Sequence, residues 1–161
     1  MDSKNITETY DYHTTFIKSA IELAEHSPCI KKKVGAVLVE GGHIIATGHN
    51  GPPPGTYHCA EMSLTTGCPR SIRGGCALSI HAEQNTIFKA LGSSLNLKGS
   101  TLYVTLSPCL PCARIIFGVG IAKVVYKDSY ATYKQLAIEE GLNFLHAYGI
   151  TVEKYDLLKD S

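Results

Sequence analysis

The sequence has no run of about 18 apolar residues, the length at which a stretch becomes a candidate membrane-spanning helix. Residues Met1 to Tyr12 are polar and lack the charged and then apolar pattern of a secretory signal. The 161 residues also contain no internal repeat, linker or low-complexity segment. We therefore expect one domain, residues 1–161, located in the cytoplasm and without contact to a membrane.

A strong excess of charge is missing as well. The chain has 15 Lys and Arg against 14 Asp and Glu, which gives a net charge of +1 at pH 7. Proteins that bind nucleic acid usually present a basic face, and the one dense group of cations here is Lys31–Lys33. We interpret this group as a solvated turn before a strand, so the charge disfavours nucleic acid as a partner.

Six cysteines are present, and their arrangement indicates metal binding. Disulfide bonds are expected mainly in secreted proteins, and this chain shows no secretory signal. Cys109 and Cys112 form a C-x-x-C pair that follows the string His81-Ala82-Glu83. A redox role for the pair is the competing interpretation, but it leaves His81 and Glu83 without a purpose.

The hydrophobic pattern predicts strands that alternate with helices, which implies parallel pairing. A helix between the last two strands allows them to lie parallel. The segment 51–79 differs from the rest, because it is rich in Pro, Gly and Cys and forms a long insertion. The expected helices are 12–26, 81–92, 108–120 and 133–148, and the expected strands are 34–39, 43–48, 101–106, 122–126 and 151–155.

His81, Cys109 and Cys112 provide one imidazole and two thiols, which suit a tetrahedral zinc ion. Three protein ligands leave the fourth position open, as in a catalytic rather than a structural site. We expect Ser107 to cap the helix of the two cysteines, with Pro108 in its first turn. The positive end of that helix favours the thiolate form that zinc requires.

Glu83 lies two residues after the histidine, where it can transfer protons without binding the metal. A water molecule on such a zinc ion has a pKa near about 7 and is a nucleophile at neutral pH. The pattern H-x-E…P-C-x-x-C is the signature of zinc-dependent nucleobase deaminases. In their reaction Glu83 would move protons from water to the base and to ammonia, and the Ala82 N–H is a candidate to bind the base carbonyl.

The chain resembles the cytidine deaminase superfamily, and within it the deoxycytidylate (dCMP) deaminases of bacteria and phages. The resemblance spans about residues 29 to 155. It implies an α/β, three-layer cytidine deaminase-like fold, with a five-stranded mixed sheet flanked by helices. The matching strings are Lys33–Val37, Gly48–Gly51 with Gly55, His81–Ile87, Tyr103–Cys109 with Cys112–Ala113, Gly120–Ile121 and Val124–Tyr126.

The same resemblance implies hydrolytic deamination of dCMP to dUMP, which feeds thymidylate synthesis. It also implies that the enzyme is a homo-oligomer, a hexamer or another number, with dCTP and dTTP as effectors. By carry-over, Asn50 contacts the sugar hydroxyl and Tyr130 packs against the substrate. Ser107, Pro108 and Tyr126 complete the expected substrate-binding set. The residues that bind the phosphate stay open, with Lys89, Ser93, Ser94 and the proline-rich loop as candidates.

Four cysteines remain outside the catalytic set: Cys29, Cys59, Cys68 and Cys76. A closed structural zinc site needs four ligands. The resemblance implies a structural zinc with ligands near Cys29 and Cys59, and His58 could replace one cysteine. We expect this second metal to hold the insertion against the end of the first helix.

Two other functions compete with dCMP deamination. The chain could deaminate tRNA or another nucleic acid, or a free nucleoside or other nucleotide. It could also be a zinc-binding module without enzymatic activity. The near-neutral charge disfavours nucleic acid as the substrate, and the open three-ligand set with Glu83 disfavours a purely structural module.

Overall fold

The computed structural model describes residues 12–59, 61, 68–69, 71–72, 75–129 and 135–156. Helices and strands alternate along most of this part of the chain. In chain order they are α1 (Tyr12–Glu25), β1 (Gly35–Glu40), β2 (His43–His49), α3 (Ala82–Gly92), β3 (Thr101–Leu106), α4 (Leu110–Gly118), β4 (Lys123–Asp128), α5 (Gln135–Ala147) and β5 (Thr151–Lys154).

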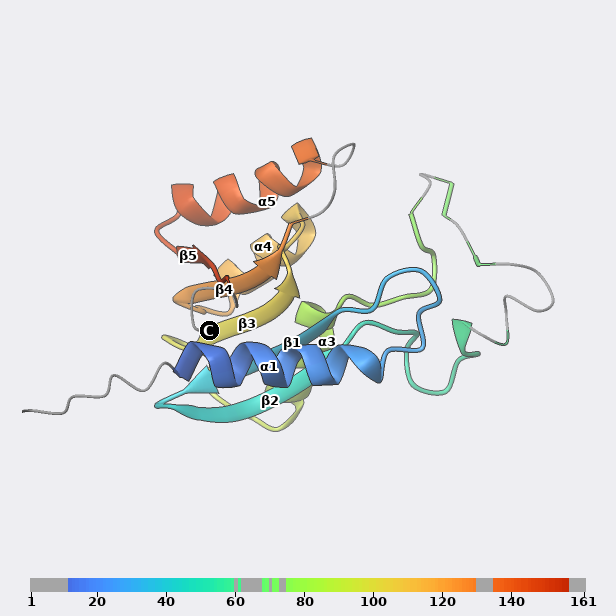
Figure 1. Cartoon of the computed structure of the whole chain (residues 1–161), viewed down its shortest axis with the longest axis horizontal. Helices are drawn as coiled ribbons and strands as arrows, with labels where there is room; N and C mark the ends of the chain where they lie inside the picture. Colours follow the sequence, from blue (N-terminus) through green and yellow to red (C-terminus); the bar gives the residue numbers. More distant parts are fainter. Residues whose placement is uncertain are drawn as a thin grey trace, which may run out of the picture.

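The strands form one mixed sheet in the order β2-β1-β3-β4-β5 (Figure 1). Strand β1 pairs antiparallel with both β2 and β3. Strands β3, β4 and β5 pair in parallel, because a helix connects each of them to the next. The predicted five-stranded mixed sheet with parallel last strands is thus confirmed.

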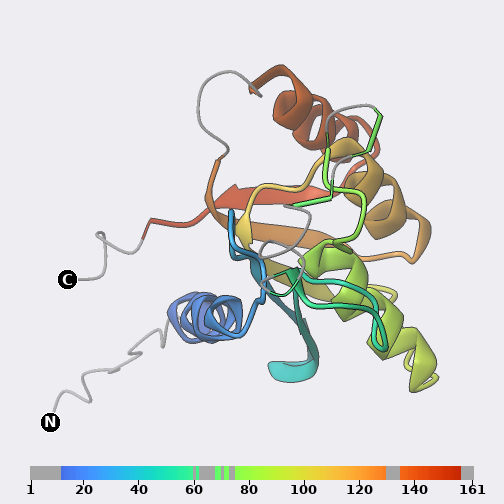
Figure 2. The same cartoon turned by 90° about the vertical axis from the view of Figure 1, so that its right-hand side faces the viewer.

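Helix α1 covers one face of the sheet, and α3, α4 and α5 cover the other (Figure 2). Side chains that alternate along each strand fill the two resulting cores. On β1, Val37 and Val39 pack with Phe16 on the α1 side, whereas Ala36 and Leu38 belong to the larger core on the opposite side. The predicted three-layer arrangement is therefore confirmed.

The start of α4 differs from the prediction. Its N-cap is Cys109, not Ser107, so Pro108 lies before the helix and the expected capping role of Ser107 is wrong. The Ser107 N–H donates a 2.8 Å hydrogen bond to the carbonyl of Asp128. This bond prolongs the parallel pairing of β3 with β4, and the chain turns into the helix only two residues later.

Both ends of the expected insertion 51–79 are joined at its base. The Gly51 N–H donates to the Ile80 carbonyl at 3.1 Å, and the Ile80 N–H donates to the Gly51 carbonyl at 2.8 Å. The described pieces between these residues project away from the sheet (Figure 1). Because His81 follows Ile80 directly, this backbone pair fixes where α3 begins.

No helix in the described part of the chain combines the length and apolar character that crossing a bilayer requires.

Candidate metal centre and active site

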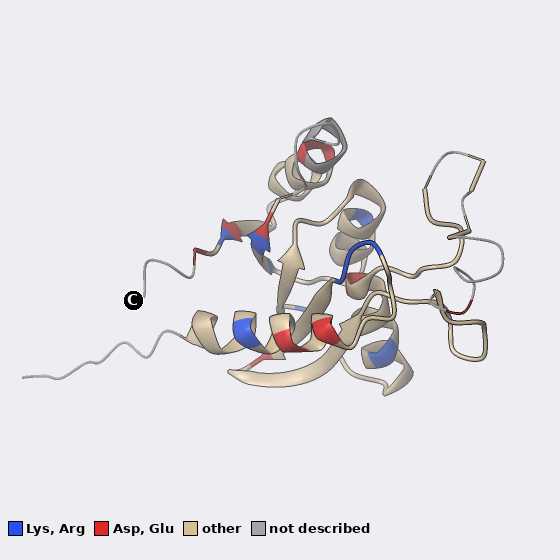
Figure 3. Cartoon of the chain, turned by 45° about the vertical axis from the view of Figure 1, so that its right-hand side comes forward, with Lys and Arg blue, Asp and Glu red and all other residues tan. Residues whose placement is uncertain are grey.

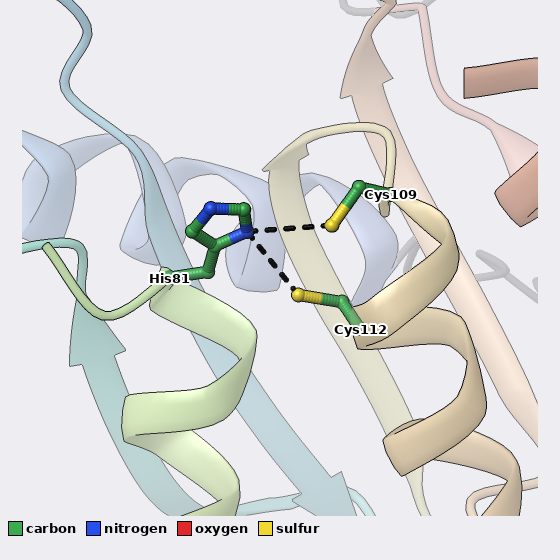
Figure 4. Close-up of side chains that lie close together, drawn as sticks. All are labelled: His81, Cys109 and Cys112. Atoms are coloured by element: carbon green, nitrogen blue, oxygen red, sulfur yellow. Dashed lines mark hydrogen bonds between the residues drawn. The ribbon is translucent and has the colours of Figure 1, made fainter. Parts of the chain in front are cut away.

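The starts of α3 and α4 bring together one histidine and two cysteines (Figure 4). The Nδ1 atom of His81 lies 3.4 Å from the Cys109 sulfur and 3.3 Å from the Cys112 sulfur. All three ligand atoms lie within 4.8 Å of one another. The sequence predicted this group although His81 lies 28 and 31 positions from the two cysteines, and the fold brings the three side chains together.

Local backbone structure fixes each of these side chains. His81 is the N-cap of α3, and its N–H donates to Oε1 of Gln84 at 3.1 Å. Asn85 in the next position donates from Nδ2 to the carbonyl of His49 at 2.8 Å, which ties α3 to the end of β2. Cys112 is fully buried within the first turn of α4. The histidine and this cysteine therefore start from rigid elements.

Hydrogen bonds among the three groups shift their proton affinities. The hydrogen bond from Cys112, helped by His81, lowers the pKa of Cys109 to about 4. The same bond to Cys109, together with burial, raises the pKa of Cys112. The bond to Cys109 raises the pKa of His81 to about 8. The pKa of Cys109 therefore lies below the usual value of a thiol, and that of its partner Cys112 lies above it.

Glu83 is the second residue of α3 and is buried, with 4% of its surface exposed. Burial is the main reason that its pKa is raised to about 7, and the neighbouring His81 acts in the opposite direction. A carboxyl group with a pKa near the working pH can both accept and deliver protons. The environment of Glu83 therefore suits the acid–base role expected from the sequence.

The donor set fits a zinc ion. One imidazole nitrogen and two thiolate sulfurs are ligands that zinc prefers, and three of them leave one position of a tetrahedron for solvent or substrate. Within the described residues, these three are the one group of His, Cys, Asp or Glu with ligand atoms this close together.

Asn50 directly follows β2, and its side chain forms hydrogen bonds that hold the neighbouring loop in place. Its Oδ1 accepts hydrogen bonds from the Ser27 hydroxyl at 2.7 Å and the Val34 N–H at 2.8 Å. Its Nδ2 donates to the carbonyl of Lys32 at 2.8 Å. The amide thereby braces the loop between α1 and β1, and one N–H of Nδ2 remains for a ligand.

The residues around the start of α4 offer polar groups for a substrate. The Ser107 hydroxyl is buried and has no hydrogen-bond partner among the described residues. The Ala82 N–H belongs to the first residue of α3, where a helix provides no backbone acceptor. Both groups can therefore bind a ligand without breaking an existing helix bond.

The other expected substrate-binding residues differ in their surroundings. Tyr126 is 8% exposed and packs in the larger core, and Pro108 connects β3 to α4. Tyr130 lies outside the described residues. Lys89 was a candidate to bind the phosphate, but its Nζ donates a 3.3 Å hydrogen bond to the carbonyl of Thr47 on β2. It also lies about two helical turns beyond His81.

The remaining cysteines lie around Cys59, which is 1% exposed. Burial and then the nearby thiols of Cys29, Cys76 and Cys68 raise the pKa of Cys59. Their sulfurs do not form a group of three within 4.8 Å, although all four residues are described. The structure thus gathers these cysteines in one region without arranging them as a closed site.

Two residues next to the site, Gln84 and Thr86, were not assigned a role from the sequence. Gln84 bonds to the backbone of His81, and its position three residues after the N-cap is a known capping signal. Thr86 is fully buried, and its hydroxyl donates to the Ala82 carbonyl at 2.8 Å. A Cβ placed on Gly48 would lie 2.6 Å from that hydroxyl, so β2 and α3 are in direct contact behind the site.

The three-layer fold and the His/Cys/Cys group at two helix starts together define a zinc-binding deaminase domain. The family model described as "Cytidine and deoxycytidylate deaminase zinc-binding region" matches residues 11–128. The chain therefore belongs to this family.

Individual relatives agree with this assignment. The chain is 35% identical to the deoxycytidylate deaminase of Saccharomyces cerevisiae over 150 residues, which cover 90% of this chain and 45% of that protein. It is 31% identical to the deoxycytidylate deaminase of phage T4, over 73% of this chain and 78% of that one. The chain thus spans less than half the length of the two yeast deaminases that it matches.

A solved structure is also similar. The dCMP deaminase of cyanophage S-TIM5, determined in complex with dCMP and dUMP, superposes with a TM-score of 0.72 and 34% sequence identity. The match covers 88% of this chain and 95% of the phage protein.

Proposed function

We propose that this chain is a zinc-dependent hydrolase that converts dCMP and water to dUMP and ammonia, and so supplies dUMP for thymidylate synthesis. The principal support is the group formed by His81, Cys109 and Cys112 next to the buried Glu83. The names of the relatives and the dCMP and dUMP complex of the phage protein support the choice of substrate.

In this proposal His81, Cys109 and Cys112 hold the catalytic zinc. A bound zinc ion supplies Lewis acidity, which makes water reactive at neutral pH. Glu83 accepts a proton from the attacking water and delivers protons to the ring nitrogen and to the departing ammonia. Its burial makes this exchange possible, because it raises the pKa of the carboxyl group to about 7.

The substrate contacts are part of the same proposal. Asn50 uses its remaining N–H toward the sugar hydroxyl, and the Ala82 N–H binds the base carbonyl. We assign the Ser107 hydroxyl, which has no hydrogen-bond partner among the described residues, to the substrate, with Pro108 beside it in the chain. Tyr126 and Tyr130 contribute to the pocket wall.

The choice of a nucleotide over a nucleoside requires cations for the phosphate. Lys31–Lys33 lie on the segment between α1 and β1 (Figure 3). The start of β1 pairs with the end of β3, from which the chain continues to Cys109, so this segment lies at the same end of the sheet as the proposed metal site. Asn50 holds this segment through the Lys32 carbonyl, whereas the Lys33 ammonium pairs with Glu25 at 3.5 Å. We assign the phosphate to Lys31 and Lys32, in place of the solvated turn expected from the sequence.

A second, structural zinc belongs to the proposal, with Cys29, Cys59, Cys68 and Cys76 as its ligands. The thiols of Cys29, Cys76 and Cys68 lie near enough to Cys59 to raise its pKa, which supports this assignment. Metal analysis of the folded protein should give two zinc ions per chain. One zinc per chain would refute the second site and leave the first intact.

Assembly, regulation and location complete the proposal. Apolar side chains of α3 are exposed, with Phe88 at 50% and Leu91 at 47%, and we propose that they contribute to a homo-oligomer. Phe88→Glu should reduce the molecular mass measured by light scattering.

We also propose that dCTP and dTTP act as effectors, which turnover of dCMP with each nucleotide added would test. We propose that the protein works in the cytoplasm, which cell fractionation would test.

Ammonia release tests the main proposal against its alternatives. Purified protein is incubated with dCMP, dCTP, deoxycytidine and an RNA hairpin. We expect turnover of dCMP, lower turnover of deoxycytidine, and loss of this preference in a Lys31→Ala, Lys32→Ala variant. Activity on RNA alone would favour a nucleic-acid deaminase, and zinc binding without any turnover would favour a non-enzymatic module.

A further inference from the structure

Gly141 lies in the interior of α5, where glycine is unfavourable. A glycine inside a helix costs about 1 kcal/mol relative to alanine. Its φ is not among the positive values found at other glycines, so the backbone conformation does not require it. The reason for glycine here must therefore be packing.

The packing partner is the backbone that carries the first cysteine ligand. A Cβ placed on Gly141 would lie 2.9 Å from the carbonyl carbon of Cys109 and 3.1 Å from the nitrogen of Leu110, and it would lie closer still to the carbonyl oxygen of Pro108. These are main-chain atoms, which cannot rotate away as a side chain could. Any side chain at position 141 must push α5 and this turn apart.

Cys109 depends on such support more than Cys112 does. Cys112 is inside α4 and fully buried. Cys109 is the N-cap residue, has extended torsions of φ −74° and ψ 167°, and is partly exposed. The Cys109 carbonyl accepts a hydrogen bond from the Ala113 N–H at 2.8 Å. The backbone of α5 at Gly141 lies against the same turn.

We propose that Gly141 is a positioning residue of the metal site: the direct contact of the α5 backbone with Pro108–Leu110 holds Cys109 where its sulfur meets His81. This inference rests on the proposed zinc site. Metal–ligand distances tolerate errors of only about 0.2 Å, so a small displacement of this turn weakens binding. Because coupling between sites is reciprocal, a bound metal must in turn stabilise α5.

A pair of glycine variants tests the proposal. Gly141→Ala introduces the clash, whereas Gly118→Ala adds the same methyl group in α4, where a Cβ meets nothing within 4 Å. The dissociation constant for zinc is measured by competition with a chelator, and the absorption bands of the cobalt(II)-loaded protein report the thiolate ligands. Circular dichroism checks that both variants are folded.

We expect Gly141→Ala to bind zinc about 10- to 100-fold more weakly, the range found when groups that support metal ligands are lost. Its cobalt bands should shift, while Gly118→Ala should match the wild type in both measurements. Wild-type affinity and bands in a folded Gly141→Ala protein would overturn the inference.

A measurement on the unmodified chain covers the case in which Gly141→Ala does not fold. Hydrogen exchange is compared between zinc-loaded and zinc-free wild type. We expect zinc to slow exchange in α5 as well as at the start of α4. Protection of α4 without any change in α5 would overturn the inference, whereas a wild-type chain that binds no zinc would instead refute the proposed function.

Discussion

The side-chain amide of Asn50 donates a 2.8 Å hydrogen bond to the backbone carbonyl of Lys32, across the loop between α1 and β1. The same side chain accepts the N–H of the buried Val34 at 2.8 Å. Asn50 therefore holds the segment that carries the three lysines. Asn50, which the sequence suggested as a substrate-binding residue, thus also braces the loop between α1 and β1.

Replacing Asn50 by alanine should destabilise the protein by about 1–3 kcal/mol, the cost of leaving buried polar groups without partners. Urea unfolding followed by circular dichroism measures this change in the free energy of unfolding. Asn96→Ala is the control, because Asn96 is exposed and, among the described residues, its side chain accepts only the Lys98 N–H at 3.1 Å. An Asn50→Ala protein as stable as the wild type would contradict the bracing role.

Gly48→Ala should destabilise the contact between β2 and α3 by about 1–3 kcal/mol, as overpacking in a core typically does. The new methyl group would lie 2.6 Å from Oγ1 and 2.8 Å from the backbone nitrogen of Thr86. Thr86→Ala removes the first contact only, so the double variant should recover part of the loss.

A double-mutant cycle in urea measures this coupling. Gly92→Ala is the control, since a Cβ there meets nothing within 4 Å. Additive effects of the two substitutions would show that the Thr86 hydroxyl is not the obstacle.

Glu83→Gln should reduce the turnover of dCMP by about 10²- to 10⁴-fold, the usual contribution of a general acid–base group. Glutamine keeps the shape of the side chain but cannot exchange protons, so the zinc content should stay unchanged. Ammonia release and metal analysis give the two values. Glu22→Gln on the exposed surface of α1 should keep full activity, and an active Glu83→Gln enzyme would rule out the proposed proton transfer.

Cys59→Ser should remove the second zinc and leave the first in place. A ligand that binds the folded state tightly adds about 2–4 kcal/mol, so its loss should lower Tm by about 4–16 °C. Metal analysis and thermal melting of the two proteins measure these effects. His58→Ala shows whether the histidine is a ligand instead, and two zinc ions in the Cys59→Ser protein would exclude Cys59.

The group formed by His81, Glu83 and the two cysteines was predictable because its pattern is local. His81 and Glu83 lie two residues apart, Cys109 and Cys112 lie three apart, and each pair occurs at a helix start. The alternation of helices and strands was equally clear, because short and mostly apolar runs bounded by turn residues separate the helical segments, and β1 and β3 are buried almost throughout. Strand 101–106 has the predicted bounds for this reason.

Other features depend on contacts between distant segments. The pairing of Ser107 with Asp128 delays the start of α4, and no local signal shows this. Likewise, the side chain of Asn50 is drawn into the loop before β1 by residues 16 to 23 positions away. The close approach of Gly141 to Pro108 connects residues 33 positions apart, and the sequence shows only a glycine in a helix.

The two hydrogen bonds between Gly51 and Ile80 join the ends of the insertion directly before His81. Closing a longer loop costs little, about 0.6 kcal/mol for each doubling of its length. Segments of different length could therefore connect these two residues while His81 keeps its place, provided that they keep the cysteines of the proposed second zinc site. This gives evolution, or an engineer, one place where the segment before His81 can change its length without moving the histidine.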